Sequence, residues 1–580
     1  MLHEIPSDEH GPLTKPMTHA IETCVHCGFC LAACPTYQEL GQEMDSPRGR
    51  IILMKEVLEG KLSWEAAQPH VDRCLGCLAC EPACPSGVPY RDLISPFRAV
   101  AQSHFQRSFG EKLSRWLSAQ TVPYPGRFRA AATMGRVGKM FSPLLPASLK
   151  SMLELLPSQL PPKESWPEVS PARGERRARV ALLIGCAQQV LDPDINTATI
   201  EVLTRNGVEV VVPRAQGCCG GLAWHTGALG AAQDFARRNL AAFPDDEDAI
   251  LTNAAGCGSA MHEYHLVLAG TPDEARAEKF RHRVMDVSVF LHKLGLREKP
   301  AGAAQVKVAY HDACHLANAQ NVRREPRELL RAIPGVTLTE LANAHLCCGS
   351  AGSYNMDQPE IAASLGAQKA QSVIATGASL VASGNIGCLT QLRLHLEKLG
   401  SPIKIRHTMQ VLRDAYATPP DSKNFLLNNT TQNNRTMNTN TPPPPAYGLS
   451  ITLEQARKIS AAAQEEALRN GWRMVVAIMD AGGHLVLLER MDTAQFGSVQ
   501  VAQDKARSAV AFRRPTKAFH DMVAAGGEGL RMLVMSGAVP IDGGLPILVV
   551  GAVIGGIGIS GGTSAQDGQV AQAGLVALTN

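Results

Sequence analysis

Cys24-Val-His-Cys27-Gly-Phe-Cys30-Leu-Ala-Ala-Cys34-Pro35 is the stretch that decides the N-terminal fold, and Cys74-Leu-Gly-Cys77-Leu-Ala-Cys80-Glu-Pro-Ala-Cys84-Pro85 repeats its spacing. Both have the form CxxCxxCxxxCP. The close spacing allows three thiolates to converge on one iron–sulfur cluster from a single tight loop. The proline after the fourth cysteine ends that loop without needing a backbone donor. A disulfide or zinc framework is the alternative, but zinc usually takes four ligands at wider paired spacings. The two stretches therefore predict two [4Fe–4S] clusters.

The doubled motif resembles that of bacterial two-cluster ferredoxins, in which the fourth cysteine of each run ligates the other cluster. The resemblance assigns one cluster to Cys24, Cys27, Cys30 and Cys84, and the other to Cys74, Cys77, Cys80 and Cys34. We expect the apolar neighbours to limit solvent access to the clusters; they are Val25, Phe29, Leu31, Leu75 and Leu78. His26 is expected to be either a partly exposed loop histidine or a hydrogen-bonding partner of cluster sulfur.

The net charge, the cysteine count and the absence of long apolar runs argue against some classes of protein. The net charge is +3, from 56 basic and 53 acidic residues, so composition does not support nucleic-acid binding. All 16 cysteines can be placed in cluster-like motifs, which leaves no disulfide framework and favours a reducing compartment. The N-terminus lacks a secretory signal pattern, and no apolar run reaches 18 residues. We therefore expect a cytoplasmic protein, either free or peripheral on the inner face of the membrane.

A basic segment follows the cluster motifs and suggests where a membrane contact would lie. Residues 101–157 contain eight basic residues and only two acidic ones. The basic residues are Arg107, Lys112, Arg115, Arg127, Arg129, Arg136, Lys139 and Lys150, and the acidic ones are Glu111 and Glu154. Apolar residues are interleaved with them: Trp116, Phe128, Met140, Phe141 and Leu144. Such a segment either lies on anionic lipid or docks on a partner. The alternative is a solvated helical connector packed on the ferredoxin module.

From about residue 176 the chain becomes an α/β repeat. Strands are predicted at 180–184, 208–212 and 249–253 in the first half, and at 306–310, 335–341 and 379–382 in the second. The cysteines that follow them recur at matching intervals: Cys186, Cys218, Cys219 and Cys257, then Cys314, Cys347, Cys348 and Cys388. This agreement predicts a tandem duplication with parallel sheets and helices on both faces.

The tandem CCG layout resembles the cysteine-rich domains of heterodisulfide reductase-type proteins. Those domains end in CxxC, whereas this chain has Ala260 and Gln391 at the last positions. The eight cysteines therefore have three open interpretations. They hold a further cluster; they form a site for a quinone, a flavin partner or another metal; or they are inert buried thiols. His311 and His315, which flank Cys314, are either metal ligands or satisfied polar residues at a strand end.

The combination of a dicluster ferredoxin and two CCG domains resembles the iron–sulfur subunit of glycolate oxidase (glycolate dehydrogenase) over roughly residues 15–416. Ser46-Pro47-Arg48-Gly49-Arg50-Ile51 is similar to a segment found across that family. The same architecture occurs in the C subunit of anaerobic glycerol-3-phosphate dehydrogenase and in lactate-utilisation proteins. The resemblance implies a subunit that takes electrons from an FAD-containing partner. No FAD or NAD fingerprint is visible in the chain itself.

A separate domain with a different sequence pattern begins after residue 447. Residues 417–447 are dominated by Asn, Thr and Pro, which predicts a disordered, flexible linker. In residues 448–580 a capping box at Thr452 opens a helix, and further helices are expected at 498–511 and near 564. Hairpins are expected at 475–488 and 542–559, the second turned by Asp542-Gly543-Gly544, and the predicted fold is α+β. The stretches MDAGGHLVLLERMD, AQDKARSAV and GGLPI…GGIGISGG resemble the GlcG/HbpS-like, or haem-degrading domain, family. That resemblance implies haem or a corrinoid in some members, with His484 and His520 as the available ligands.

These observations predict a multidomain α/β protein. Its domains are a ferredoxin-type module (1–100), a helical connector (101–175), two CCG domains (176–300 and 301–416), a linker (417–447) and a GlcG/HbpS-like domain (448–580). The leading hypothesis is an electron-transfer subunit of glycolate dehydrogenase, inactive alone, that passes electrons from a flavoprotein through two [4Fe–4S] clusters to a quinone-type acceptor. The alternatives are the same role in a glycerol 3-phosphate or lactate dehydrogenase complex, a thiol/disulfide reductase, and a redox-linked haem sensor.

Overall fold

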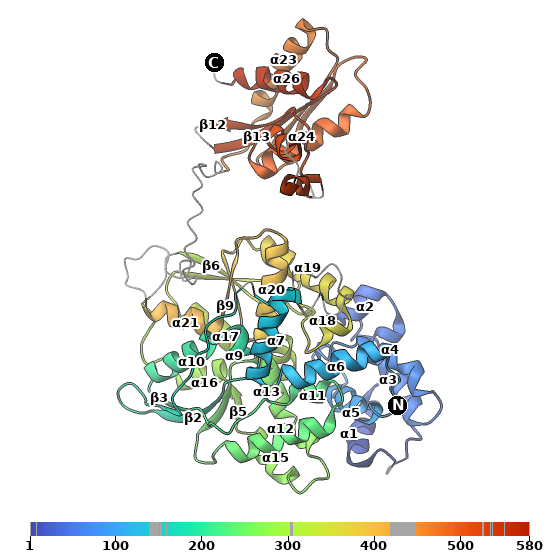
Figure 1. The fold of residues 1–580 in the computed structure, drawn as a ribbon, viewed down its shortest axis with the longest axis vertical. Coiled ribbons are helices and arrows are strands. Elements are labelled where there is room, and N and C mark those ends of the chain that lie inside the picture. Colours follow the sequence, from blue (N-terminus) through green and yellow to red (C-terminus); the bar gives the residue numbers. More distant parts are fainter. Residues whose placement is uncertain are drawn as a thin grey trace. The chain divides into compact units, whose positions relative to one another are not determined.

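The computed structural model describes residues 2–6, 9–138, 150, 153–157, 159–301, 305–417, 447–524, 527–533, 535, 537–549 and 552–578. The chain divides into two compact units, Met1–Gln432 and Asn433–Asn580, called here the N-terminal and C-terminal units (Figure 1). The linker predicted at 417–447 lies, apart from its two end residues, outside the described residues.

Helices bracket both cysteine loops of the ferredoxin module. α1 (Thr14–Thr23) ends just before Cys24, and α2 (Pro35–Leu40) begins just after Cys34 with proline in its first position. α4 (Trp64–Arg73) ends just before Cys74. The remaining helices are α3 (Pro47–Leu58) and α5 (Arg91–Ala101). Fully buried Met17, Ile21, Met54, Leu93 and Phe97 form the core that holds these helices together.

The predicted duplication is confirmed by the sheets. Each half contains four parallel strands in the order second, first, third, fourth. In the first half these are β2 (Ala178–Leu183), β3 (Val208–Val211), β4 (Ala249–Thr252) and β5 (Val284–Asp286). In the second they are β6 (Val306–Tyr310), β7 (Val336–Glu340), β8 (Leu380–Ser383) and β9 (Lys404–His407). β5 and β9 were not predicted, and neither was β1 (Val169–Ser170), which pairs antiparallel with β3.

Helices cover these sheets, and one hydrophobic core joins the two halves. In the first half the helices are α9 (Gln188–Leu191), α10 (Asp194–Arg205), α11 (Gly221–His225), α12 (Leu229–Ala242), α13 (Ala255–His262), α14 (Tyr264–Val267), α15 (Glu274–Arg281) and α16 (Val287–Leu294). In the second they are a π-helical turn (His315–Ala319), α17 (Arg324–Arg331), α18 (Tyr354–Asp357), α19 (Pro359–Ala375), α20 (Ile386–Lys398) and α21 (Thr408–Ala417). Buried residues of both halves share a cluster that includes Val180, Leu251, Val308 and Leu380. The halves are therefore packed as one body with the ferredoxin module, which also joins the core of the first half.

The C-terminal unit has the predicted α+β fold. Its antiparallel sheet has the order β11 (Leu485–Arg490), β10 (Val475–Asp480), β13 (Ala552–Ser560) and β12 (Gly544–Val549). Alternate residues of β10 face opposite layers, α23 (Leu453–Arg469) with α26 (Ser564–Val576) on one side and α24 (Ser498–Phe512) on the other. The capping box at Thr452 is present.

Two details of this unit differ from the predictions. β12 and β13 are joined after Val549, so Asp542-Gly543-Gly544 leads into β12 rather than turning the hairpin. α25 (Lys517–Ala524) and a 3₁₀ segment (Gly527–Leu533) were not predicted.

Candidate metal centres

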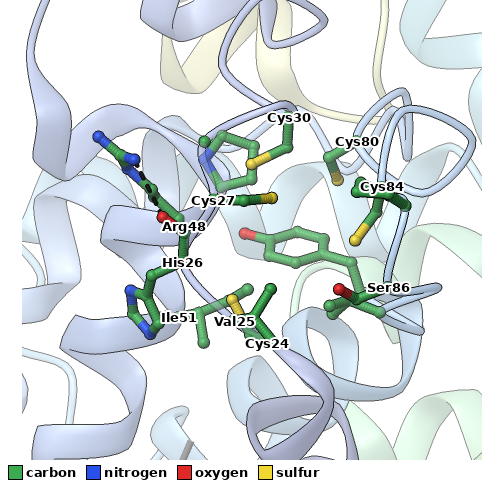
Figure 2. A pocket seen from close by; sticks show the side chains of 15 residues that line it. Cys24, Val25, His26, Cys27, Cys30, Arg48, Ile51, Cys80, Cys84 and Ser86 are labelled. Carbon is green, nitrogen blue, oxygen red and sulfur yellow. Dashed lines mark hydrogen bonds between the residues drawn. The ribbon is translucent and has the colours of Figure 1, made fainter.

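The cysteines of the ferredoxin module line two small cavities. Cys24, Cys27, Cys30 and Cys84, called here set 1, line one together with Cys80 and Arg48 (Figure 2). Cys34, Cys74, Cys77 and Cys80, called set 2, line the other. Tyr90 borders both cavities. The structure thus brings together the crossed groups of cysteines, while the ligation of each cluster stays a prediction.

The backbone of each loop turns through the left-handed region on both sides of its second cysteine. In the first loop these residues are His26 (φ 57°) and Gly28 (φ 86°); in the second they are Gly76 (φ 62°) and Leu78 (φ 56°). Each loop thus places glycine at one of the two positions and tolerates a side chain at the other. His26 is partly buried in this turn, and its carbonyl oxygen accepts a hydrogen bond from Arg48 (3.2 Å).

The Ser46-Pro47-Arg48-Gly49-Arg50 segment places one arginine beside each set. Ser46 caps α3 by accepting a hydrogen bond from the Gly49 amide (3.0 Å). A Cβ on Gly49 would lie 2.0 Å from the Glu43 carbonyl oxygen, so only glycine fits there. The tight start of α3 directs Arg48 to the set 1 cavity and Arg50 to the set 2 cavity. The sequence singled out this segment only through resemblance, not through the role of either arginine.

Arg50 is a buried positive charge beside the set 2 sulfurs. Its guanidinium lies 3.8 Å from Cys34 Sγ and 3.3 Å from Asp45 Oδ1, and Nε donates to the His70 carbonyl oxygen (2.6 Å). Burial raises the pKa of the Cys74 thiol, but the charges of Arg50 and Arg98 outweigh it and the net pKa lies below the ordinary value. A cavity lined by four thiols and by the buried guanidinium of Arg50 fits an anionic iron–sulfur cluster.

The two sets differ in exposure, and one prediction about their surroundings was wrong. Cys27 of set 1 is exposed, and beside it Val25 and Phe29 are 65% and 69% exposed. These two side chains therefore do not shield the site. At set 2, Leu75 and Leu78 are buried as predicted. Within the described residues of the N-terminal unit, the loop of set 1 therefore lies at the surface, which the local sequence could not reveal.

The four cysteines of the first CCG domain gather at the carboxyl ends of β2 and β4. These neighbouring strands flank the point where the strand order reverses, where ligands usually bind in such sheets. Cys218 Sγ lies 3.5 Å from Cys186 Sγ. Hydrogen bonds from Cys218 and Cys257 hold the pKa of Cys219 well below its ordinary value. The sulfurs thus form one group suited to a metal or cluster.

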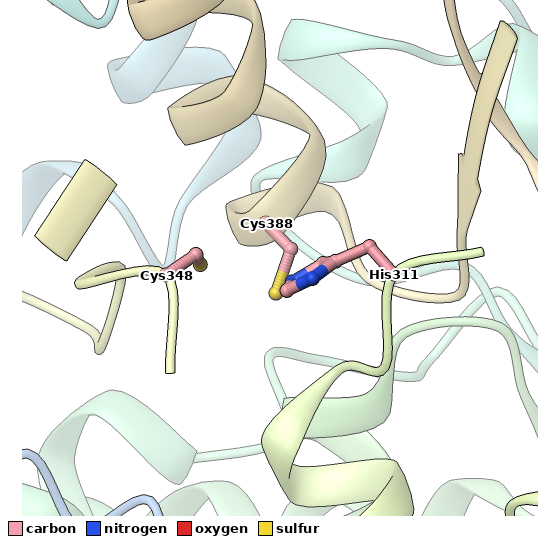
Figure 3. Close-up of side chains that lie close together, drawn as sticks. All are labelled: His311, Cys348 and Cys388. Atoms are coloured by element: carbon pink, nitrogen blue, oxygen red, sulfur yellow. The ribbon is translucent and has the colours of Figure 1, made fainter. Parts of the chain in front are cut away.

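The second CCG domain repeats this arrangement and adds a histidine. Cys314 Sγ lies 3.9 Å from Cys347 Sγ. One ligand atom each from His311, Cys348 and Cys388 lies within 4.8 Å of the others, and all three side chains are buried (Figure 3). Both ring nitrogens of His311 are buried without a nitrogen or oxygen partner in the described part of the chain. This donor set fits a thiophilic metal.

His315, the other histidine of this motif, has a different environment. Its Nδ1 lies 3.5 Å from Cys314 Sγ, and its ring lies 5.5 Å from that of His225. At the positions where the resembling domains carry their last cysteine, Ala260 is buried and the Gln391 amide is hydrogen-bonded to Asn355 (2.6 Å) and to the Ala362 carbonyl oxygen (2.9 Å). These positions therefore supply no thiol.

The basic segment forms α6 (Phe109–Thr121) and α7 (Pro125–Gly138). Arg107 and Arg115 pair with Asp72, and Arg115 also reaches Asp357 (3.4 Å), so part of the positive charge is neutralised within the N-terminal unit. Lys139, Met140, Phe141 and Leu144 lie outside the described residues. No helix in the described ranges has both the length and the apolar character needed to cross a bilayer.

The two histidines of the C-terminal unit are both exposed. His484 is 83% exposed and lies 3.4 Å from Asp480 Oδ1 in its own hairpin turn. His520 on α25 is 50% exposed and lies 3.3 Å from Asp521. Lys505 and Asp567, by contrast, form a buried ion pair (2.7 Å) that links α24 to α26.

The fold and its thiol groups define a class: a dicluster iron–sulfur protein with two CCG domains. Three family models match the chain and agree with this class. The 4Fe-4S dicluster domain matches residues 20–88, and the cysteine-rich (CCG) domain matches residues 180–262 and 308–393. The haem degrading protein HbpS-like model matches residues 451–576.

Sequence identity to known proteins shows which family within this class the chain belongs to. The chain is 38% identical to the Escherichia coli (strain K12) glycolate oxidase iron–sulfur subunit over 403 residues, covering 68% of this chain and 94% of the relative. It is 36% identical to the probable Bacillus subtilis (strain 168) counterpart over 414 residues, covering 68% and 93%. Lactate utilization protein A 2 of Bacillus mycoides (strain KBAB4) is 30% identical over 236 residues, covering 40% and 98%. The chain belongs to the glycolate oxidase iron–sulfur subunit family, with an HbpS-like domain fused after it.

Proposed function

We propose that this chain carries electrons from a flavoprotein that oxidises glycolate to glyoxylate, and delivers them to a quinone-type acceptor. The observation that carries the proposal is the unequal placement of the two thiol sets. Set 1 reaches the surface at Cys27, whereas set 2 is buried against the CCG domains. When bound, the clusters supply one-electron transfer.

The surface around set 1 has the character of an entry point. Val25 and Phe29 project from the loop that carries Cys27 and are exposed. Exposed aromatic and aliphatic side chains around an otherwise polar site are typical of protein interfaces. We therefore assign the flavoprotein to this face, because docking there brings its flavin nearest to set 1.

Contacts on the other side connect set 2 with the CCG domains. Cys77 shares a buried cluster with Cys314 and Cys347. Asn318 Nδ2 donates to the Cys77 carbonyl oxygen (3.1 Å), and the Tyr354 hydroxyl donates to the Arg73 carbonyl oxygen (2.8 Å). These bonds hold the loop of set 2 against the second CCG domain, so electrons that reach set 2 have a short route into the CCG region.

The first experiment is anaerobic purification with the co-purifying flavoprotein, followed by EPR after addition of glycolate, lactate or glycerol 3-phosphate. Reduction of the clusters by glycolate, and not by the others, is the expected result. Reduction by lactate alone would keep the electron-transfer role and replace the substrate, an outcome that the lactate utilization relative makes worth measuring. No reduction by any substrate, with flavin and clusters retained, would overturn the proposal.

A pair of variants tests the path itself. Cys27→Ala in set 1 and Cys77→Ala in set 2 should each abolish electron transfer from flavin to quinone. Both should leave reduction of the partner's flavin by its substrate intact. If both variants retain full quinone reduction, the thiol sets are structural and the path is wrong.

For the C-terminal unit we propose haem binding, supported by the match to the haem degrading protein HbpS-like family. His484 and His520 are the exposed imidazoles it offers. Titration of residues 448–580 with haemin, followed by absorbance, tests this, with His484→Ala and His520→Ala identifying the ligand. Absence of a haem spectrum at micromolar concentrations would contradict it.

A further inference from the structure

A cavity of about 280 Å³ lies where the ferredoxin module meets both CCG domains. Its wall includes Cys74 of set 2 together with Cys219 and Cys257 of the first CCG domain. Its volume is close to the lower limit of about 300 Å³ for small-molecule sites, which suits a compact headgroup. A ligand here would touch residues of two thiol groups at once.

Polar groups suited to carbonyl oxygens line this cavity. His225 has a buried Nε2 atom with no hydrogen-bond partner among the described residues, while its Nδ1 lies 3.3 Å from Ser95 Oγ. Burial, with the nearby charges of His315 and Arg98, lowers the pKa of His225 to about 3, so the imidazole is neutral. Arg115 also lines the cavity, and its two ion pairs are long (3.5 and 3.4 Å).

α6 lines one side of the cavity and is apolar on its outer side. Arg115, Ser118 and Val122 face the cavity. The opposite side carries four exposed residues at helical spacing: Phe109 (81% exposed), Leu113 (44%), Trp116 (58%) and Leu117 (37%). Lys112 on α6 is exposed, and so is Arg127 on α7, whose guanidinium donates hydrogen bonds to Gln120 of α6. An exposed apolar helix face with basic neighbours is typical of helices that lie in the headgroup region of a membrane.

A second, smaller cavity extends from the first along α6. The two share Ser118, Leu222 and Thr226, and the smaller one is bordered mainly by apolar residues such as Ala231 and Phe235. The polar cavity therefore continues into an apolar one on the inner side of the same helix.

We propose that the cavity between Cys74, Cys219 and His225 is the headgroup site of a membrane quinone, and that the outer face of α6 rests on the lipid surface. A lipid-soluble acceptor explains both features together, since the helix that would touch the membrane also lines the site. The inference rests on the proposed function, whose acceptor it locates. In the reaction the quinone takes two electrons, one at a time from the loaded centres, and two protons from water, and leaves as the quinol. His225 Nε2 is placed to bind one quinone oxygen.

The pocket is tested without the flavoprotein. The full chain with its clusters is reduced with dithionite, freed of excess reductant, and mixed with decylubiquinone in a stopped-flow instrument. His225→Leu should slow cluster reoxidation at least tenfold, and His225→Gln, which can still donate, should recover most of the rate. A photoreactive azidoquinone should label peptides of α6 or α11, and His225→Leu should weaken this labelling. Unchanged reoxidation in His225→Leu, or labelling elsewhere, would overturn the headgroup site.

The lipid face is tested by sedimentation of the full chain with vesicles of phosphatidylethanolamine and phosphatidylglycerol. A Phe109→Ser, Leu113→Ser, Trp116→Ser variant should lose at least tenfold in binding. Ile374→Ser with Leu399→Ser, which removes exposed apolar side chains elsewhere in the unit, should bind as the parent does. Unchanged vesicle binding in the α6 variant, or loss of flavoprotein binding in its place, would overturn the membrane assignment. If substrate fails to reduce the clusters while dithionite-reduced protein still reduces quinone, the proposed function fails and the pocket stands.

Discussion

Replacement of Arg50 by methionine should lower the reduction potential of the cluster held by set 2. The guanidinium is fully buried and lies 3.8 Å from Cys34 Sγ. Burial opposes its charge, but the surrounding Cys74, Tyr90, Cys34 and Asp45 raise its pKa, so it remains cationic. A buried cation stabilises the more negative, reduced cluster. Its removal therefore makes reduction harder.

The size of the shift follows from Coulomb's law. Two unit charges 3.8 Å apart interact by about 4.4 kcal/mol at an effective dielectric constant of about 20. For a one-electron couple this is about 190 mV, taking 59 mV for each tenfold change in the equilibrium constant. The added electron is spread over the cluster, and Asp45 offsets part of the charge. We therefore expect a fall of roughly 60–100 mV.

The assay is an EPR-monitored redox titration of the full chain, with iron and sulfide content measured on each sample. Arg50→Lys keeps the charge and should shift the potential by less than half as much. Arg48→Met, which removes the arginine beside set 1, should shift the set 1 signal and leave set 2 in place. A fully loaded Arg50→Met protein whose set 2 potential stays within about 15 mV of the parent would refute the electrostatic reasoning.

Three further outcomes are expected. Val25→Ser with Phe29→Ser should weaken binding of the flavoprotein at least tenfold in a pull-down titration without altering dithionite reduction of the clusters, and unchanged binding would place the partner elsewhere. Burial raises the pKa of Glu263 to about 7, so the folded state holds a proton that the unfolded state releases above about 4.3, and the stability of the parent should fall as pH rises between these values. Glu263→Gln should flatten this pH dependence in calorimetry from pH 5 to pH 8; an equally steep fall in the variant would exclude Glu263 as its source. Lys505→Met should destabilise the C-terminal unit by about 3–5 kcal/mol, because it leaves Asp567 buried without its partner, and Lys505→Met with Asp567→Asn should recover part of this loss in the same calorimetric transition.

Local patterns were sufficient for most of the architecture. The CxxCxxCxxxCP spacing and the Thr452 capping box depend on residues close together in the chain. The repeated CCG intervals are found by comparing two stretches of the sequence, and the sheets of both halves confirm that duplication. The short strands β5 (Val-Met-Asp) and β9 (Lys-Ile-Arg-His) were missed because neither is an apolar run of the kind that marked the equally short β4 and β8. The strands of the second C-terminal hairpin lie in the predicted range. Its turn motif was misassigned because turn residues mark a bend without stating which strands it joins.

The metal centres also divide into features that the sequence predicted and features that only the structure shows. The sequence by itself determined which residue types supply the chemistry, because sulfur ligands are specified by identity and spacing. Only the tertiary structure decided what surrounds them: that Arg50 lies against set 2, that Val25 and Phe29 are exposed, that His311 joins Cys348 and Cys388, and that His225 lies in a cavity with Cys74. These pairs are far apart in the chain or depend on which neighbour covers a loop. The burial of a side chain, the electric field at a site and the access of solvent to it depend on tertiary packing, and no local sequence pattern encodes them.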